Sequence, residues 1–328
     1  MQTNLVKHFI QQGGRIKPLL IPSSITNGTG LCNPSIFVDG EDILINIRHV
    51  GYNLYHSEKN QKYPSWHGPL IYLHPEDDLT LRTDNYLGKL NENLDVEYIH
   101  KVDTSTLDTP PQWEFIGLED ARIIKWEDKL YLSGVRRDVK SNGEGRIELS
   151  EIHLTSEYAK EVSRKRIQPP DPSSYCEKNW MPILDKEYQY VKWTNPTEVV
   201  KIDPDILQAT QTIFPNIRYN LPRDIRGGSQ VIKMDKYYVA LTHEVDLWKN
   251  ETGYKDAQYY HRFIIWDEKF NMIHTSPEFK FMDARVEFAC GMARYKDKYL
   301  ITFGFQDNAA YILEVPTLVL ENYLINGK

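Results

Sequence analysis

One local outline recurs five times along the chain and constrains the fold more than any other feature. In each copy a strand-like run meets a short charged turn, and a second run rich in aromatic or β-branched residues follows. The second copy shows this most fully, with Leu118–Ile124, a turn at Trp126–Lys129, and Leu130–Val135. The five copies begin near Asn33, Phe115, Glu177, Arg226 and Glu287. Repetition of one supersecondary unit indicates a repeat architecture.

The spacing of the copies fits the blades of a β-propeller. Successive copies are separated by 87, 60, 48 and 61 residues when their equivalent positions are Pro34, Ala121, Met181, Ser229 and Cys290. A four-stranded blade takes about 40–50 residues, so each interval holds one blade with loop insertions. Further strands are expected at Leu70–Leu73, Arg146–His153, Glu198–Ile202, Tyr259–Trp266 and Ala309–Val315. The sequence therefore predicts an all-β fold, a five-bladed β-propeller.

Both ends of the chain lie outside the repeats. Residues 1–30 are expected to form a leader segment with a short helix near Leu5–Gln11, and residues 316–328 a short C-terminal helix and tail. The proline-rich stretches at Pro110-Pro111 and Pro169–Pro172 are interpreted as loops between blades. Residues 1–328 are therefore predicted to be a single five-bladed propeller domain.

Composition narrows the class of partner. The net charge of −7 argues against a nucleic acid held by phosphate neutralisation. The sequence contains no run of about 18 apolar residues, so no membrane span is expected. Met1–His8 does not resemble a secretory signal. Cys32, Cys176 and Cys290 are widely separated, which favours reduced, buried thiols in a cytoplasmic protein over disulfides or a metal site.

Polar residues are expected to converge at one end of the propeller. The start of each first strand and the end of each second strand lie at the same end, because antiparallel neighbours reverse direction. Arg48, Arg136, Arg137, His243 and Glu244 end second strands, and these side chains should face the same rim as a ring of residues from the first strands. That ring contains Asn33, Glu119, Asp120, Glu177, Lys178, Asn179, Arg226, Ser229 and Glu287. Five blades that each supply polar groups to one rim indicate a binding pocket.

Four short motifs resemble a known family. Asn33-Pro34, Gly117–Arg122, Lys178-Asn179 and the hairpin that contains His243 are similar to motifs of the five-bladed propellers of glycoside hydrolase family 130. These are β-mannoside phosphorylases and some β-mannosidases, and the related mannosyltransferase-phosphorylases of glycosyltransferase family 108 share the pattern. The resemblance covers about residues 30–315 and implies a carbohydrate-active enzyme.

The resemblance also implies roles for particular residues. Asp120 matches the aspartate that protonates the glycosidic oxygen while phosphate attacks the anomeric carbon, with Glu119 as its acidic neighbour. A carboxyl group can donate this proton only if its pKa is raised. Strand alternation predicts that Glu119 points away from Asp120. Lys178, His243 and Arg146 match the phosphate-binding residues by place, and Arg137 and Arg48 are further candidates for binding phosphate or the donor.

The remaining polar residues of the rim are predicted to bind sugar. They are Asn33, Asn179, Trp180, Arg226, Ser229, Glu244 and Glu287. An aromatic face suits the apolar side of a pyranose, so Trp66, Trp113 and Trp248 are stacking candidates beside Trp180, although most such tryptophans pack between blades. Gly227-Gly228 is interpreted either as a close approach to a ligand oxygen or as a plain bend.

Three functions remain open from the sequence. The first is transfer of a mannosyl-like residue between a β-glycoside and inorganic phosphate, a sugar phosphate or a nucleotide sugar, which act as substrates without a cofactor or metal. The second is inverting hydrolysis with Glu177, Glu244 or Glu287 as the base. The third is glycan binding without chemistry. The expected partners are a small carbohydrate and phosphate, and an oligomer is possible.

Overall fold

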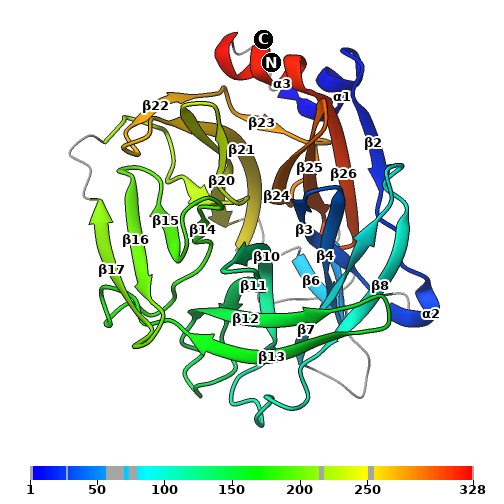
Figure 1. Ribbon diagram of the computed structural model, residues 1–328, viewed down its shortest axis with the longest axis vertical. Coiled ribbons are helices and arrows are strands. Elements are labelled where there is room, and N and C mark those ends of the chain that lie inside the picture. Colours follow the sequence, from blue (N-terminus) through cyan, green and yellow to red (C-terminus); the bar gives the residue numbers. More distant parts are fainter. Residues whose placement is uncertain are drawn as a thin grey trace.

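Five antiparallel sheets surround one axis (Figure 1). The computed structural model describes residues 3–26, 29–56, 70–73, 80–213, 218–249 and 255–326. Each predicted hairpin supplies the two inner strands of one sheet, and all five hairpins are antiparallel. The predicted five-bladed β-propeller is therefore confirmed.

The first two blades are continuous with one another. Blade 1 consists of β3 (Leu31–Asp39), β4 (Asp42–Val50), β7 (Leu81–Leu90) and β8 (Val96–Asp103). Blade 2 consists of β10 (Leu118–Trp126), β11 (Lys129–Arg136), β12 (Arg146–Leu154) and β13 (Ala159–Arg166). The outer strands β8 and β13 pair in parallel, and the short β9 (Phe115–Ile116) pairs with β7.

Blades 3 and 4 have interrupted inner strands. Blade 3 contains β14 (Met181–Pro182), β15 (Gln189–Trp193), β16 (Glu198–Asp203) and β17 (Gln208–Ile213). In blade 4 the innermost strand is split into β18 (Arg226–Gly227) and β19 (Ile232–Met234), and both parts pair with β20 (Tyr237–Lys249). Blade 4 continues with β21 (Lys255–Trp266), which pairs with β22 (Met272–Thr275) and β23 (Phe279–Lys280).

The N-terminal segment closes the ring. Blade 5 is built from β24 (Glu287–Tyr295), β25 (Lys298–Phe305), β26 (Ala309–Pro316) and, as its fourth strand, β2 (Arg15–Pro18). The preceding β1 (Thr3–Asn4) pairs with β23 of blade 4. Residues 1–30, expected as a leader, thus supply strands to two adjacent blades.

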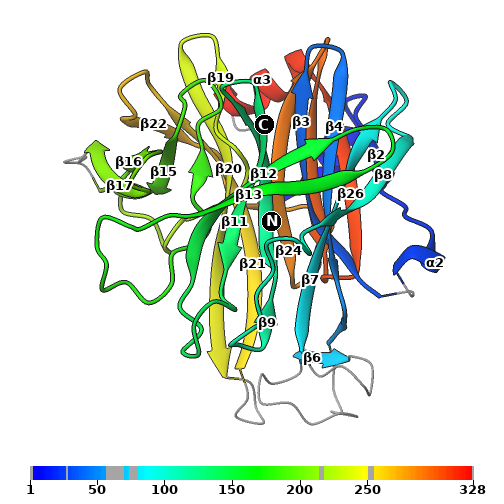
Figure 2. The ribbon, with the colours of Figure 1, turned by 60° about the horizontal axis from the view of Figure 1, so that its bottom comes forward.

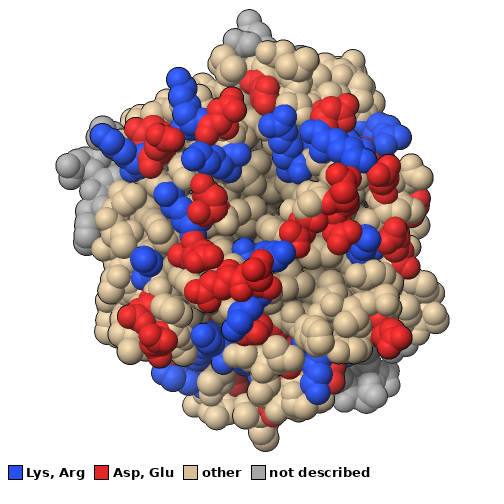
Figure 3. Space-filling model, in the orientation of Figure 1, with Lys and Arg blue, Asp and Glu red and all other residues tan. Residues whose placement is uncertain are grey.

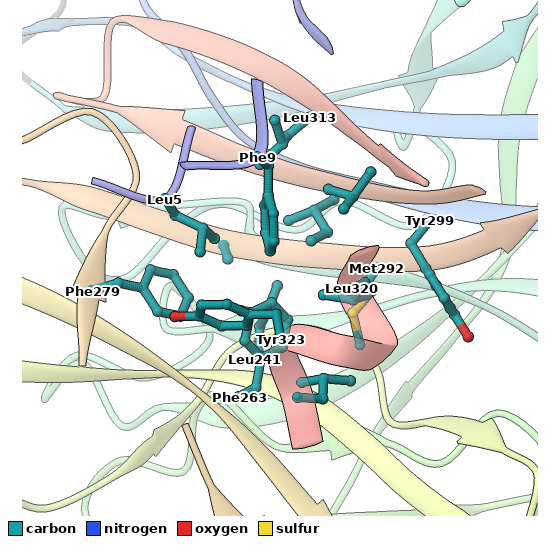
Figure 4. Packing of buried hydrophobic residues seen from close by; sticks show 14 of the residues in the cluster. Leu5, Phe9, Leu241, Phe263, Phe279, Met292, Tyr299, Leu313, Leu320 and Tyr323 are labelled. Carbon is teal, nitrogen blue, oxygen red and sulfur yellow. The ribbon is translucent and has the colours of Figure 1, made fainter. Parts of the chain in front are cut away.

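Two helices seal the seam between blades 4 and 5. Helix α1 (Leu5–Ile10) begins at Asn4, whose side chain accepts a hydrogen bond from the Lys7 amide. It and α3 (Thr317–Asn326), both predicted from the sequence, place Phe9 and Tyr323 in one buried cluster with Phe263 and Leu313 (Figure 4). A third helix, α2 (Ser23–Thr26), is short.

One predicted blade strand is wrong. Leu70–Leu73 forms β6, which pairs with β5 (Asn53–His56) in a separate two-stranded sheet. The third strand of blade 1 is β7, in which Arg82, Thr83 and Asp84 precede the apolar part. The short apolar run was more strand-like in composition than this polar stretch, but β7 is the strand that pairs with β4 along its whole length.

The strands run between two different faces. The tight turns of the hairpins lie at one face, and β9, β6 and the far end of the β20–β21 hairpin lie at the other (Figure 2). On the turn face, Lys and Arg alternate with Asp and Glu (Figure 3), as in the pairs Lys125–Asp39 and Lys296–Glu92, both 2.7 Å. Exposed pairs of this kind contribute little stability. No helix among the described residues is long and apolar enough to cross a membrane.

We predict that the seam between blades 4 and 5 depends on Phe9. Phe9→Ala leaves a cavity where a fully buried ring packs, and should lower the free energy of unfolding by about 3–5 kcal/mol. Ile10→Ala, at the exposed neighbouring position, should stay within about 0.5 kcal/mol. Urea titration measures both. Equal, small effects would show that the N-terminal segment does not stabilise the ring.

Candidate active site

A buried arginine organises the rim opposite the turns. Arg48 lies near the end of β4, in the buried part of the strand, and its side chain is only 7% exposed. Its Nη1 donates to Asp120 Oδ1 at 2.8 Å, and Nη2 lies 3.4 Å from Glu119 Oε2. Nε and Nη2 also donate to the Thr83 hydroxyl at 3.2 and 3.1 Å. A buried guanidinium is tolerated when its hydrogen bonds are satisfied in this way.

Two strand bulges turn Asp120 toward Asn33. The pairing of β10 with β11 shifts between Glu119 and Arg122, and that of β3 with β4 shifts between Cys32 and Ser35. Asp120 and Asn33 occupy these bulges with φ of 49° and 45°, in the left-handed region that Asn and Asp adopt more readily than other side chains. Asn33 Nδ2 donates to Asp120 Oδ1 at 2.7 Å. Blades 1 and 2 therefore meet at this carboxylate.

The bulge overturns one expectation. Alternation along a regular strand would point Glu119 away from Asp120, yet both carboxylates contact Arg48. The reason is that a bulge adds a residue to one strand and breaks the period of two.

A second arginine holds the backbone beneath the carboxylates. Arg122 is buried, and its Nη1 donates to the Asp120 carbonyl at 2.6 Å. Its Nε donates to the Gly228 carbonyl at 2.8 Å, and Nη2 reaches Asn179 Oδ1 at 3.5 Å. This one side chain joins blade 2 to blade 4 and to the segment that enters blade 3. The position of Asp120 is thus fixed from both sides.

The two carboxyl groups are driven in opposite directions. Burial opposes ionisation of Asp120, but the charges of Arg48 and Arg122, the hydrogen bond from Asn33 and the charge of Lys178 outweigh it, so its pKa lies below the usual value. Burial dominates at Glu119 and raises its pKa, with the charge of Asp120 adding to the effect and that of Arg48 opposing it. The raised pKa expected of Asp120 is therefore found at Glu119 instead.

A third carboxyl group belongs to the site and was missed in the sequence. Asp307 lies in the turn between β25 and β26, at the end of the fifth hairpin. Burial raises its pKa, the charge of Arg48 opposes this, and the charge of Asp120 adds to it. Second strands of the hairpins end at this rim, and β25 ends at Phe305. Asp307, two residues later, could therefore have been predicted to lie at the rim.

Two cations without a carboxylate partner lie near this group. Lys178 is exposed. Its charge contributes to lowering the pKa values of Asp120 and His243, and it opposes the rise in the pKa of Glu119. Arg137 also acts on Glu119, and it donates to the Gly143 carbonyl at 3.0 Å and the Tyr175 hydroxyl at 3.1 Å. Neither forms an ion pair with another residue in the described part of the chain. Cations of this kind can bind an anion without first breaking an ion pair.

His243 faces the site as a neutral ring. Burial, together with the nearby His261, Arg226 and Lys178, lowers its pKa well below the usual value. Its Nδ1 lies 2.9 Å from the Gly227 carbonyl, which can only accept, so Nδ1 carries the proton and Nε2 is an acceptor. The ring is held between Tyr259, stacked at 5.8 Å, and the edge of Phe288 at 4.8 Å. His243 therefore offers an acceptor rather than a positive charge.

Several predicted residues are occupied elsewhere. Arg146 is buried and pairs with Glu144 at 2.9 Å, and its Nη1 donates to the Gly145 carbonyl. Trp180 lies in the core between blades 2 and 3, where its Nε1 donates to Glu177 Oε2 at 2.9 Å, so it offers no face for sugar stacking. Ser229 is fully buried and bonds the Leu241 amide and the Gln230 carbonyl. These contacts are structural.

Glu244 and Glu287, also predicted to bind sugar, make structural contacts as well. Glu244 is fully buried between Arg262 and Arg223, on the opposite side of β20 from His243. Glu287 accepts hydrogen bonds from the amides of Phe281, Met282 and Ala284 at 2.7, 2.7 and 3.0 Å, so it caps a loop. Neither carboxylate reaches the group around Asp120, because both satisfy buried donors that the sequence pattern does not reveal.

Trp113 and Trp248 do not mark a sugar platform either. Trp113 packs against Gly143, and Trp248 is 38% exposed with Arg285 over its ring at 5.4 Å. Trp66 lies outside the described residues. Of the predicted sugar contacts, Asn33 and Asn179 stand beside Asp120 and Arg122, and Arg226 lies beside His243. Gly227 is explained by packing, because a Cβ there would collide with the Asn179 carbonyl.

Comparison with solved structures confirms the fold suggested by the motifs. The propeller is similar to a β-1,2-mannobiose phosphorylase from Listeria innocua, at 14% identity and a TM-score of 0.58, over 94% of this chain and 96% of that one. It is also similar to a protein of glycoside hydrolase family 130, a family of mannoside phosphorylases containing glycoside hydrolases that target β-1,2-mannosidic linkages in Candida mannan (14% identity, TM-score 0.54, 87% and 84% covered). A glycosyl hydrolase from Bacteroides ovatus gives 13% identity and a TM-score of 0.53, with 87% and 84% covered.

Sequence comparison adds no relative. No family model and no curated protein matches the chain. The likeness is therefore one of fold, and the site has to be argued from its own geometry.

We predict that removing the organising guanidinium destabilises the protein in a pH-dependent way. Arg48→Met leaves two buried carboxylates beside an apolar side chain, which should lower the free energy of unfolding by about 3–5 kcal/mol at pH 7. Because the pKa of Asp120 is depressed, its ionisation stabilises the native protein above the unfolded pKa of about 3.9, and this contribution is lost as pH falls through the folded value. In the variant, burial without the charge of Arg48 should raise the pKa of Asp120, so its carboxyl group takes up a proton at a pH where that of the wild-type protein is still ionised, and the penalty should shrink between pH 7 and pH 4.

Urea titration at the two pH values measures the effect. The control is Arg294→Met, at an exposed arginine next to the β24–β25 turn. A penalty of equal size at both pH values would contradict the assignment of Arg48 as the partner of Asp120.

Proposed function

We propose that the protein transfers a mannosyl-like residue between a β-glycoside and phosphate, either inorganic or carried by a sugar. The observation that carries this proposal is the arrangement at one rim: Asp120 and Glu119 share Arg48, while Lys178 and Arg137 stand nearby without a carboxylate partner. An acid next to unpaired cations suits a reaction in which an anion attacks while a leaving oxygen is protonated. The named activities of the structural neighbours and the motif resemblance support the same reaction class.

The proposed chemistry is a single displacement. An oxygen of hydrogen phosphate forms a bond to the anomeric carbon, and the bond from that carbon to the glycosidic oxygen breaks. The bonding electrons move to the leaving oxygen, which takes a proton from the carboxyl group of Asp120. The new glycosyl phosphate then returns its proton to Asp120, so no proton is gained or lost overall. The anomeric configuration inverts.

The charge of bound phosphate favours protonation of Asp120. The surrounding cations favour the ionised form of Asp120. A phosphate dianion bound by Lys178 and Arg137 adds negative charge beside the carboxylates and weakens that preference, because like charges favour the protonated form. Glu119, whose pKa is already raised, can keep the neighbouring proton in the site. Asp120 is therefore protonated more readily when phosphate is bound.

The three glutamates predicted as the base of a hydrolase make other contacts in the structure. Glu177 accepts from Trp180, Glu244 is enclosed by two arginines and Glu287 caps a loop. Asp307 is the remaining separate carboxyl group near the acid pair. Turnover of a β-mannoside that depends on phosphate favours the phosphorylase, turnover in phosphate-free buffer favours a hydrolase, and binding without turnover favours a glycan-binding propeller.

We predict that Asp120 is required for turnover. Asp120→Asn keeps the shape but removes the proton donor, so phosphorolysis of a β-mannoside should fall by about 10²–10⁴. An aryl mannoside whose leaving group needs no proton should recover part of the rate. Asp128→Asn, in the fully exposed turn of the same hairpin, is the matched control and should be unaffected.

Glu119→Gln should cost less than Asp120→Asn and shift the pH profile, because it removes a neighbouring charge. The opposite order of the two variants would assign the acid to Glu119. Full turnover in both would leave the pair with a structural role and end the proposal.

We predict that Lys178 binds the attacking phosphate. Lys178→Ala removes a charged hydrogen bond worth about 1.5–3 kcal/mol, which corresponds to roughly a 10–100-fold rise in the half-saturating phosphate concentration. The matched control is Lys201→Ala, an exposed lysine on β16 of the same blade. Steady-state kinetics against phosphate separates the two. An unchanged phosphate dependence in Lys178→Ala would remove this residue from the site.

A further inference from the structure

A cavity opens between blades 3 and 4, next to the candidate active site. Its volume is about 610 Å³, within the usual range for small-molecule sites. Residues 218–224 and Arg226 form most of its wall, Asn195 closes it from blade 3, and Val245 of β20 completes it. None of these residues was assigned above to the chemistry at Asp120.

The wall of this cavity is held in place by reciprocal hydrogen bonds. Asn195 Nδ2 donates to the Tyr219 carbonyl at 2.8 Å, and the Tyr219 amide donates to Asn195 Oδ1 at 2.9 Å. The Tyr219 hydroxyl reaches further, to the carbonyl of Met272 in blade 4. The segment that carries the cavity's charged residues is therefore anchored to both blades.

One of the three arginines in the cavity has no carboxylate partner among the described residues. Three arginines and one aspartate line it, although the whole chain carries a net charge of −7. Arg223 is neutralised by Asp246 and Glu278 at 2.5 and 2.8 Å. Arg218 lies 3.6 Å from Asp224, but both are mostly exposed, so this pair is weak. Arg226 forms no ion pair within the described ranges of the chain.

Arg226 also connects the cavity to the active site. It is the direct partner of His243 in the pairing of β18 with β20. Its charge contributes to lowering the pKa of His243 and opposes the rise in the pKa of Tyr259 caused by burial, Asp307 and Asp120.

We propose that this cavity binds an anionic substituent, a phosphate monoester, on the sugar that accepts or leaves with the glycosidic oxygen. The proposal rests on the proposed function and names its substrate class: a phosphorylated sugar beside the attacking phosphate. The guanidinium fork of Arg226, with Arg218 at the entrance, matches phosphate oxygens, whereas a neutral sugar gains little from an unpaired arginine. A sugar carboxylate offers similar oxygens and is the other source of such an anion.

Titration calorimetry on the full chain tests this in saturating inorganic phosphate, which fills the attack site and supports no turnover without a glycoside donor. The probes are mannose, mannose 6-phosphate and mannuronate. Mannose 6-phosphate should bind at least tenfold more tightly than mannose. Arg226→Gln should remove at least tenfold of the affinity for mannose 6-phosphate and weaken mannose binding less, and Arg218→Gln, at a 70% exposed side chain, should cause a smaller loss. Arg294→Gln is the control and should change nothing.

Several results would overturn the proposal. The first two are equal affinity for mannose and mannose 6-phosphate, and no measurable binding of mannose 6-phosphate. The other two are a tighter binding of mannose 6-phosphate that inorganic phosphate abolishes, and a tighter binding that survives in Arg226→Gln. An Arg226-dependent advantage shown equally by mannuronate supports the site and widens its ligand to sugar carboxylates.

The binding experiment fails independently of the catalytic proposal. Arg226-dependent binding without turnover of any glycoside would retain the anion cavity and reject the transferase. Phosphate-dependent turnover with no preference for anionic sugars would do the reverse.

Discussion

The innermost strands of the propeller are joined by one buried amide. Gln230 is fully buried in the gap between β18 and β19, and its Nε2 lies 2.9 Å from the Ile36 carbonyl, 3.0 Å from the Ile123 carbonyl and 3.2 Å from Ser35 Oγ. Its Oε1 lies 3.3 Å from the Met292 amide. Buried backbone groups need partners, and innermost strands have no neighbouring strand toward the axis. A side chain from blade 4 therefore satisfies groups of blades 1, 2 and 5.

The active site is built on the same connections. Asn33 lies two residues from Ser35, and Asp120 three residues from Ile123, so the amide sets the height at which the two bulges face each other. Arg122 repeats the principle one layer closer to the rim, between Asp120 and Gly228. The carboxylates and the guanidinium of Arg48 are consequently placed by strands that cannot shift independently. A site assembled from several blades keeps its geometry because buried polar side chains near the axis hydrogen-bond from one blade to another.

Much of this arrangement was predictable from the sequence, and the rest was hidden for physical reasons. The recurring hairpins predicted the five blades, and the antiparallel rule correctly placed Arg48, Glu119 and Asp120 at one rim. The relative direction of Glu119 and Asp120 was not predictable, because a bulge breaks the alternation on which the prediction relied. Glu244 and Glu287 were assigned to the site by position, whereas their actual partners are arginines and amides brought close by folding. A buried carboxylate looks the same in sequence whether it serves chemistry or a loop.

The way in which the ring closes has a consequence for how the chain acquires its structure. Strand β2 ends at Pro18 and its partner β26 begins at Ala309, so a strand made early in synthesis must wait for one made almost 300 residues later. Until then β2 has no strand of blade 5 to pair with, and the apolar surface of α1 has no completed seam to pack into. Contacts between distant parts of a chain form slowly. Nascent chains of this protein should therefore expose β2 as an unpaired strand edge until β26 has been synthesised, which makes this strand the point most open to capture by chaperones.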